Sequence, residues 1–230
     1  MKHAAAVVFA ALLLPASAAA SEPVVLVHGT FGDSTNWGYI APQLDAETFA
    51  IDYGNRGTGD IRESAQQLAD FVDGVLAQTG ATKVDIIGHS QGGMMPRYYV
   101  KNLGGAAKVD DLIGLSPSNH GTDLAAAEGG TCVACTQQAA GSEFLTELNA
   151  GDETPGDVDY TVIQTRYDEV VTPFASAFLD GATNVLLQDK CRADVSEHLT
   201  IVVNQNAVQW IKNALARSGP ADPGFQPRCL

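Results

Sequence analysis

The sequence predicts an α/β fold in which a mostly parallel central sheet is flanked by helices. Apolar runs of strand length alternate with longer stretches of helical periodicity, and this alternation is typical of a parallel sheet. The run at 24–27 contains no polar residue, which indicates a strand covered on both faces. We expect further strands at 49–53, 83–87, 112–115, 160–165 and 183–188.

Three segments have the spacing of amphipathic helices. Residues 61–79 repeat apolar side chains every three or four positions, and Asp60 with Glu63 resembles a capping box. A second helix is expected over 91–103, and apolar positions between 202 and 215 mark a closing helix. In such a fold the active site lies beyond the carboxyl ends of the strands.

The start of the chain has the pattern of a secretory signal peptide over residues 1–20. A short polar start precedes an apolar core at 4–14 and a row of alanines before Ser21. The apolar run is too short for a transmembrane helix, although an N-terminal anchor helix is the alternative. We therefore expect residues 21–230 to form one secreted domain with no stable membrane anchor.

Export makes the four cysteines candidates for disulfides. Cys132 and Cys135 are close enough to close a small loop, and Cys191 would then pair with Cys229 and hold a surface tail at 218–230. Other pairings stay open. The C-x-x-C spacing also fits a redox motif or half of a zinc site.

The formal net charge of −14 narrows the classes of partner. Nucleic-acid binding and strong binding to anionic membranes both require a basic surface. The negative charge therefore argues against both kinds of partner. The charge gives no other signal for a partner, so a monomer is the default expectation. No cofactor and no metal are implied.

The longest stretch without a strand pattern is 116–159, and it is a candidate for a small cap or loop insertion that carries a disulfide. Its acidic turn at 151–159 does not have the spacing of an EF-hand, so we interpret it as a solvated turn. Another segment, 54–59, has the glycine order G-x-x-G-x-G. This order is not the dinucleotide fingerprint, and we interpret the segment as a flexible loop near the mouth of the site.

Residues 88–92 read Gly-His-Ser-Gln-Gly between an expected strand and an expected helix. This is the G-x-S-x-G pattern of the nucleophile elbow of an α/β-hydrolase. A tight turn lifts the hydroxyl of Ser90 off the sheet, and the small residues at 88 and 92 relieve the crowding.

A serine hydroxyl needs a base to remove its proton, and the base needs an acid to fix its tautomer. In this fold the chain order is serine, acid, histidine. Only His120 and His198 follow Ser90. We assign the base to His198, which lies between the last strand and the closing helix, and expect His120 to support a nearby loop by hydrogen bonding.

The acid should follow a strand between Ser90 and His198. Asp168 lies at the exit of the expected strand 160–165 and is our assignment. The adjacent Glu169 points elsewhere because neighbouring side chains diverge. Asp180 and Asp189 are weaker candidates that are better explained as surface carboxylates.

The tetrahedral intermediate of acyl transfer needs preorganised N–H donors for its oxyanion. One should be the backbone N–H of Gln91, the residue after the nucleophile. The second should come from the loop after the first strand. We choose the N–H of Thr30, with Phe31 as the alternative, and the Thr30 hydroxyl as an additional donor.

Several apolar residues lie near these motifs in the sequence and are candidates for a substrate pocket, although core packing explains each of them equally well. They are Phe31, Met94, Val171, Phe174 and Leu199.

With these motifs the chain resembles a secreted bacterial lipase of the class 2 triacylglycerol lipase family. The resemblance rests on the runs at 25–30, 84–93, 98–103 and 167–171, and on His198 before the last helix. It implies an α/β-hydrolase fold, Ser90, Asp168 and His198 as the catalytic triad, and Thr30 and Gln91 as oxyanion donors. The smallest family members lack a cap, so the longer 116–159 stretch is a departure from them.

The sequence therefore predicts a secreted serine carboxylic ester hydrolase, a lipase or esterase, that acts through an acyl-enzyme on Ser90. The expected substrate is an acylglycerol or a related ester, met at an oil–water interface if the protein is a lipase. The alternatives are a cutinase-like polyesterase, an acyltransferase, and a non-catalytic binding protein with a hydrolase fold.

Overall fold

The computed structural model describes residues 21–124 and 131–229. The predicted signal peptide, residues 1–20, lies outside the described residues. So do residues 125–130 of the expected insertion and Leu230 at the end of the expected tail.

The described residues form one sheet of six strands in the order β2-β1-β3-β4-β5-β6. Every neighbouring pair is parallel, as predicted. The strands are β1 (Val24–Val27), β2 (Thr48–Ile51), β3 (Val84–His89), β4 (Val109–Leu115), β5 (Asp159–Gln164) and β6 (Thr183–Leu186).

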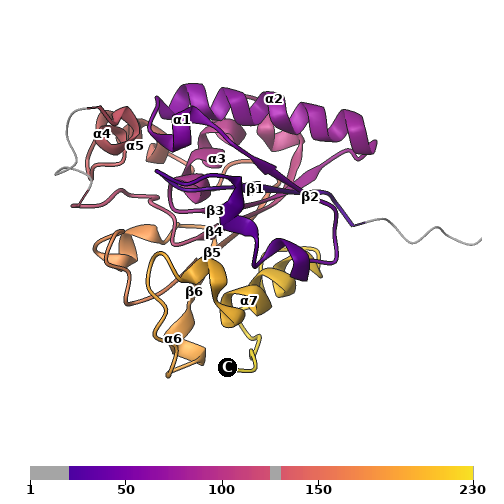
Figure 1. Ribbon diagram of the computed structural model, residues 1–230, viewed down its shortest axis with the longest axis vertical. Coiled ribbons are helices and arrows are strands. Elements are labelled where there is room, and N and C mark those ends of the chain that lie inside the picture. Colours follow the sequence, from indigo (N-terminus) through magenta and orange to yellow (C-terminus); the bar gives the residue numbers. More distant parts are fainter. Residues whose placement is uncertain (1–20, 125–130, 230) are drawn as a thin grey trace, which may run out of the picture.

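Helices cover both faces of the sheet. Figure 1 shows α2 and α3 on one side and α7 on the other. The α-helices are α1 (Gly54–Gly57), α2 (Ile61–Thr79), α3 (Gln91–Asn102), α4 (Val133–Gln137), α5 (Glu143–Asn149), α6 (Leu187–Lys190) and α7 (Gln205–Leu215). Short 3-10 turns are η1 (Ser34–Trp37), η2 (Ala41–Gln43), η3 (Gly105–Ala107), η5 (Phe174–Ala177) and η6 (Ile201–Val203).

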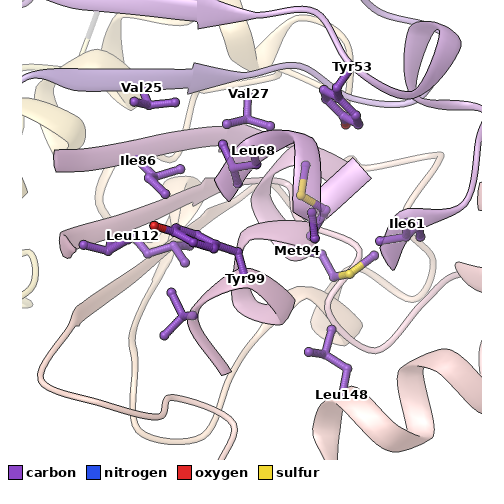
Figure 2. Close-up of a cluster of buried hydrophobic side chains, with 14 of the residues drawn as sticks. Val25, Val27, Tyr53, Ile61, Leu68, Ile86, Met94, Tyr99, Leu112 and Leu148 are labelled. Carbon is purple, nitrogen blue, oxygen red and sulfur yellow. The ribbon is translucent and has the colours of Figure 1, made fainter. Parts of the chain in front are cut away.

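The core has two apolar layers, one on each face. Side chains of Val25 and Val27 belong to the layer under α2 and α3, where Leu68 and Tyr99 are buried (Figure 2). The intervening Val24 and Leu26 belong to the layer under α7. Successive side chains of a strand point to opposite faces, so an all-apolar β1 is what a sheet covered on both sides requires.

Most predicted elements are confirmed, with different ends. Helix α2 has the predicted bounds, and the Asp60 side chain caps it by accepting from the Arg62 N–H. The strand predicted at 183–188 is too long, because its last residues begin α6. The closing helix starts only at Gln205, after Asn204 caps it by accepting from the Ala207 N–H.

Both expected disulfides are present, Cys132–Cys135 and Cys191–Cys229. The tail that precedes Cys229 is held by more than this bond. Ala221 is fully buried and donates its N–H to the Thr161 hydroxyl at 2.9 Å. The tail therefore packs partly into the body of the protein.

None of the described helices is long and apolar enough to cross a membrane.

Candidate active site

Ser90 occupies a strained turn between β3 and α3. Its φ of +56° lies in the left-handed region, which side chains other than glycine rarely adopt. A Cβ on Gly88 would lie 1.8 Å from the Gly92 carbonyl oxygen, and a Cβ on Gly92 would lie 2.2 Å from the Val27 carbonyl oxygen. The turn can be this tight only because both positions are glycine.

His198 and Asp168 form a buried pair at the carboxyl edge of the sheet. His198 Nδ1 lies 2.9 Å from Asp168 Oδ2. The other oxygen, Asp168 Oδ1, accepts the N–H groups of Val170 at 2.9 Å and Val171 at 2.7 Å. Because the Asp168 carboxylate accepts a hydrogen bond from the ring, His198 carries its hydrogen on Nδ1, and Nε2 can take a proton.

The electrostatics of this pair keep the acid ionised. Burial by itself would raise the pKa of Asp168, but the hydrogen bonds from His198, Val171 and Val170 outweigh it, so the pKa lies below its ordinary value. The ionised carboxylate then fixes the orientation of His198 and stabilises its protonated form.

Ser90 and His198 line one cavity of about 420 Å³. In this structure no hydrogen bond joins them, and such contacts are often long before substrate binds. The two side chains come from loops that follow different strands, yet they face the same space, as the motif order predicted.

The walls of this cavity correct part of the predicted substrate pocket. Phe31, Val171 and Leu199 line it. Met94 does not, because it points into the core layer under α3 and has no exposed surface (Figure 2). Phe174 does not line it either and packs edge-on against the ring of Phe178.

The insertion also contributes to the wall. Thr122, Leu124, Cys135 and Gln138 all line the cavity. Part of the 116–159 stretch therefore borders the site directly.

The carboxylates considered as alternative acids lie elsewhere. Glu169 and Asp180 are exposed, and Asp189 pairs with Arg166 on the surface at 3.2 Å. Of the described acids that follow Ser90 in the sequence, Asp168 is the one whose carboxylate bonds to the His198 ring.

His120 takes part in a separate contact. Its Nδ1 lies 3.0 Å from the Ser176 carbonyl oxygen, and its Nε2 lies 2.8 Å from Glu153 Oε1. Glu153 also accepts the Asp180 N–H, so this part of the acidic turn is not simply solvated as predicted. The histidine joins that turn to η5.

The backbone N–H groups expected to bind the oxyanion can be compared by their hydrogen bonds in this structure. The Phe31 N–H donates to the Arg56 carbonyl oxygen at 2.7 Å, which removes Phe31 as the alternative donor. Within the described ranges, the backbone N–H groups of Thr30 and Gln91 donate to no protein acceptor. The Thr30 hydroxyl, expected as an additional donor, gives its hydrogen to Gln91 Oε1 at 2.6 Å.

The segment 54–59 is more regular than the predicted flexible loop. The four residues of α1, Gly54–Gly57, all have positive φ, so this short element is a left-handed turn. It is closed by the Thr58 N–H, which donates to the Gly54 carbonyl oxygen at 2.9 Å. The Arg56 guanidinium also donates to the Phe31 carbonyl oxygen. This turn holds the loop after β1 beside the cavity.

Two groups that position His198 were not found from the sequence. His89 Nε2 lies 2.9 Å from the His198 carbonyl oxygen, and burial together with the neighbouring His198 lowers the pKa of His89 to about 3. A neutral His89 donates this hydrogen bond and fixes the backbone that carries the base. The nearness of His89 to Ser90 in the motif was the available signal.

Asp194 is the second such group. Its Oδ1 accepts the N–H and hydroxyl of Ser196, and its Oδ2 accepts the side-chain amides of Asn204 and Asn206. Burial by itself would raise the pKa of Asp194, but these hydrogen bonds have the larger effect and the pKa lies below its ordinary value. Asp194 is therefore ionised, and it closes the loop around His198. A single aspartate among many gave no sequence signal for this role.

Carboxylates close enough to one another to ligate a metal ion occur elsewhere in the described part of the chain. They are Asp85, Asp110 and Asp111, near the amino ends of β3 and β4. None of the three lines the cavity that contains Ser90.

Comparisons with known proteins agree with this geometry. The model of the family described as Lipase (class 2) matches residues 21–211. A triacylglycerol lipase of Burkholderia plantarii is 38% identical over 105 residues, which are 39% of this chain and 28% of that protein. A triacylglycerol lipase of Vibrio cholerae is 37% identical over 116 residues, which are 42% of this chain and 37% of that protein. The matched part therefore spans well under half of these relatives.

Solved structures share the fold. Lipase B of Aspergillus fumigatus superimposes with a TM-score of 0.77 at 25% identity, covering 88% of this chain and 54% of that one. The mature lipase BlEst2 of Bacillus licheniformis gives a TM-score of 0.69 at 17% identity, covering 86% of this chain and 94% of that one. The second likeness concerns the fold alone. Since the family model covers most of its sequence, this chain belongs to the class 2 lipase family.

Proposed function

We propose that this protein is a serine carboxylic ester hydrolase that acts on acylglycerols or related esters through an acyl-enzyme. The observation that carries the proposal is the arrangement of Ser90, His198 and Asp168. Ser90 stands on a strained elbow in the same cavity as His198, and Asp168 bonds to the far nitrogen of that ring. Membership of a lipase family supports the same reaction class.

The geometry supports a two-step mechanism. Ser90 Oγ attacks the ester carbonyl while His198 Nε2 takes the hydroxyl proton, and His198 then gives that proton to the departing alcohol oxygen. Water repeats the sequence on the acyl-enzyme and releases the carboxylic acid. The backbone N–H groups of Thr30 and Gln91 stabilise the oxyanion of both tetrahedral intermediates.

Apolar side chains around the cavity support a lipid substrate. Phe31 is 55% exposed, Leu124 44% and Leu199 67%, and all three line the cavity. Exposed apolar side chains that border one opening mark a surface that meets an apolar partner. We propose that this rim contacts the surface of an aggregated ester.

Export is part of the proposal. The N-terminal sequence has a signal-peptide pattern, and two disulfides are typical of proteins that mature in an oxidising compartment. N-terminal sequencing of protein recovered from the culture medium tests it. A start at Ser21 is expected, and retention of the full N-terminus in the cytosol would contradict it.

The reaction is tested with p-nitrophenyl esters of increasing chain length and with emulsified triglyceride, beside Ser90→Ala. We expect turnover that depends on Ser90. Turnover that rises toward long chains supports a lipase, and turnover confined to short chains supports an esterase or polyesterase instead. Undiminished activity in Ser90→Ala would overturn the proposal.

The lipid-contact rim is tested by Leu199→Asp, with Val203→Asp as its control. Val203 is also half exposed and apolar but does not line the cavity. We expect Leu199→Asp to lose activity on emulsified triglyceride more than on a soluble short ester, and Val203→Asp to change neither. Equal losses on both substrates would remove the interface from the proposal.

A further inference from the structure

Gln138 follows α4 directly and reaches from the insertion to the loops that hold the expected oxyanion donors. Its side chain is buried, with 5% of the residue exposed. The amide nitrogen Nε2 lies 2.9 Å from Thr30 Oγ1, 3.1 Å from Gln91 Oε1 and 3.2 Å from the Ala134 carbonyl oxygen. Two hydrogens are thus shared among three acceptors.

The direction of these hydrogen bonds is fixed. A backbone carbonyl only accepts, so the contact with Ala134 identifies the nitrogen of the Gln138 amide. That nitrogen must then face the oxygen of the Gln91 amide. The Thr30 hydroxyl completes the ring by donating to the same oxygen, Gln91 Oε1, at 2.6 Å.

Gln138 is itself held in place. The Ser118 hydroxyl donates to Gln138 Oε1 at 2.9 Å. The Gln138 carbonyl oxygen accepts the Thr122 N–H at 3.0 Å, and its N–H donates to the Ala134 carbonyl oxygen at 2.9 Å. The disulfide Cys132–Cys135 constrains the turn just before it. The amide therefore acts from a fixed support.

The two residues that Gln138 joins are far apart in the chain. Thr30 follows β1 and Gln91 follows β3. Stabilisation of an oxyanion requires two N–H groups to converge on one point, and a displacement of about 1 Å costs up to about 100-fold in rate. A link between the two side chains sets the spacing of the two backbone donors.

We propose that Gln138 is a positioning residue of the oxyanion hole, whose amide holds the Thr30 hydroxyl and the Gln91 side chain together so that both backbone N–H groups face the reacting carbonyl. The inference rests on the proposed ester hydrolase function. It assigns to the insertion a part in the reaction, through the hydrogen bonds of Gln138 to Thr30 and Gln91.

The test compares Gln138→Met with Gln137→Met on one p-nitrophenyl ester. Gln137 accepts the Ile61 N–H and donates to Asp60, so it joins α4 to α2 without touching Thr30 or Gln91. We expect Gln138→Met to lose about 10- to 100-fold in kcat with little change in KM. Gln137→Met should keep the kcat of the wild type, even if its melting temperature falls as much as that of Gln138→Met.

An alkyl boronic acid gives a readout that a purely structural role would not move. The Ser90 oxygen bonds to boron, its proton passes to His198, and the anionic tetrahedral adduct places an oxygen where the oxyanion forms. Because the adduct resembles the transition state, its Ki should rise in Gln138→Met by the same factor as kcat/KM falls. In Gln137→Met the Ki should stay that of the wild type.

Thr30→Val is the second variant, and it keeps the test decisive if Gln138→Met does not fold. It removes the hydroxyl between Gln138 and Gln91 and retains the side-chain shape. We expect a similar loss of kcat, and a double variant no worse than the more impaired single one. Wild-type kcat and Ki in either single variant would overturn this inference alone. A wild type inert to both ester and boronic acid would overturn the proposed function as well.

Discussion

At the carboxyl edge of the sheet, Asp168 and Asp194 are buried with both oxygens of each carboxylate hydrogen-bonded, whereas Asp85 and Asp111 at the amino edge are buried against one another. The first pair has pKa values below the ordinary range of aspartate. In the second pair, burial is the largest cause that raises the pKa of Asp85 to about 7 and that of Asp111 to about 8.

The amino edge is crowded with acids and has few donors. Carboxylate oxygens of Asp85, Asp110 and Asp111 lie within 4.8 Å of one another. Asp85 accepts one backbone N–H, from Asp111 at 3.2 Å. Among the described residues, nothing donates to the buried Oδ1 of Asp111, and the nearby cation Lys83 bonds to Asp110 instead.

In this comparison hydrogen-bond donors outweigh burial at Asp168 and Asp194, whereas burial prevails at Asp85 and Asp111. Each of the four residues exposes less than a tenth of its surface. At the edge where the chemistry is proposed, N–H and imidazole donors stabilise ionised carboxylates. At the opposite edge such donors are few, and the raised pKa values favour the protonated carboxyl groups. Asparagine keeps the size of aspartate, so replacing Asp168, Asp194 or Asp111 by asparagine should have three different effects.

The largest effect is expected for Asp168→Asn. The new amide N–H would face His198 Nδ1, so that nitrogen would accept and the hydrogen would move to Nε2, which could no longer take the Ser90 proton. We expect kcat to fall by about 10⁴-fold with the fold retained, as measured by ester hydrolysis and circular dichroism. A loss of less than tenfold would show that another group orients the base.

Asp194→Asn should destabilise more than it inactivates. Its new amide would point at the amide donors of Asn204 and Asn206, which leaves buried donors facing one another. We expect a cost of about 2 kcal/mol in unfolding free energy, measured by urea denaturation at pH 7, and a smaller activity loss than in Asp168→Asn. Unchanged stability would mean that the loop around His198 does not depend on this carboxylate.

Asp111→Asn should stabilise the protein, by the smallest of the three effects. Removing an acid from the crowded edge relieves the repulsion with Asp85 and Asp110. We expect a gain of about 1 kcal/mol at pH 8, or about 2–4 °C in Tm. Asp45→Asn, at a side chain that is 96% exposed, is the control and should change nothing.

The same two acids predict how the stability of the wild type depends on pH. Their pKa values are raised in the folded state, so the folded protein binds more protons than the unfolded chain between about pH 4 and pH 8. Their contribution to stability is complete below pH 4 and is lost as the pH rises through 7 and 8. Asp111→Asn should lose less stability than the wild type as the pH rises. Thermal melts of both proteins from pH 5 to 9 check this, and an equal decline of Tm in the two would contradict the interpretation.

Sequence patterns predicted those parts of the molecule that local rules determine. The all-apolar 24–27 run, the periodicity of 61–79 and the elbow around Ser90 each depend on neighbouring residues. The chain order then predicted Asp168 and His198 as acid and base, and the structure places these two within hydrogen-bond distance. The role of Gln138 could not be predicted, because it contacts Thr30 only through tertiary packing of the insertion. Met94 was misplaced for a related reason, since its proximity to Ser90 in sequence does not say which face of α3 carries it.

The most direct test of the proposed function is covalent trapping of Ser90 with a fluorophosphonate, followed by intact mass and peptide mapping. An activated serine displaces fluoride and retains the phosphonyl group, so we predict one adduct per chain, on Ser90. Ser90→Ala should gain none, and Asp168→Asn should react far more slowly. An ester-hydrolysing protein that forms no adduct, or forms it on another residue, would contradict the assignment of Ser90 as the nucleophile.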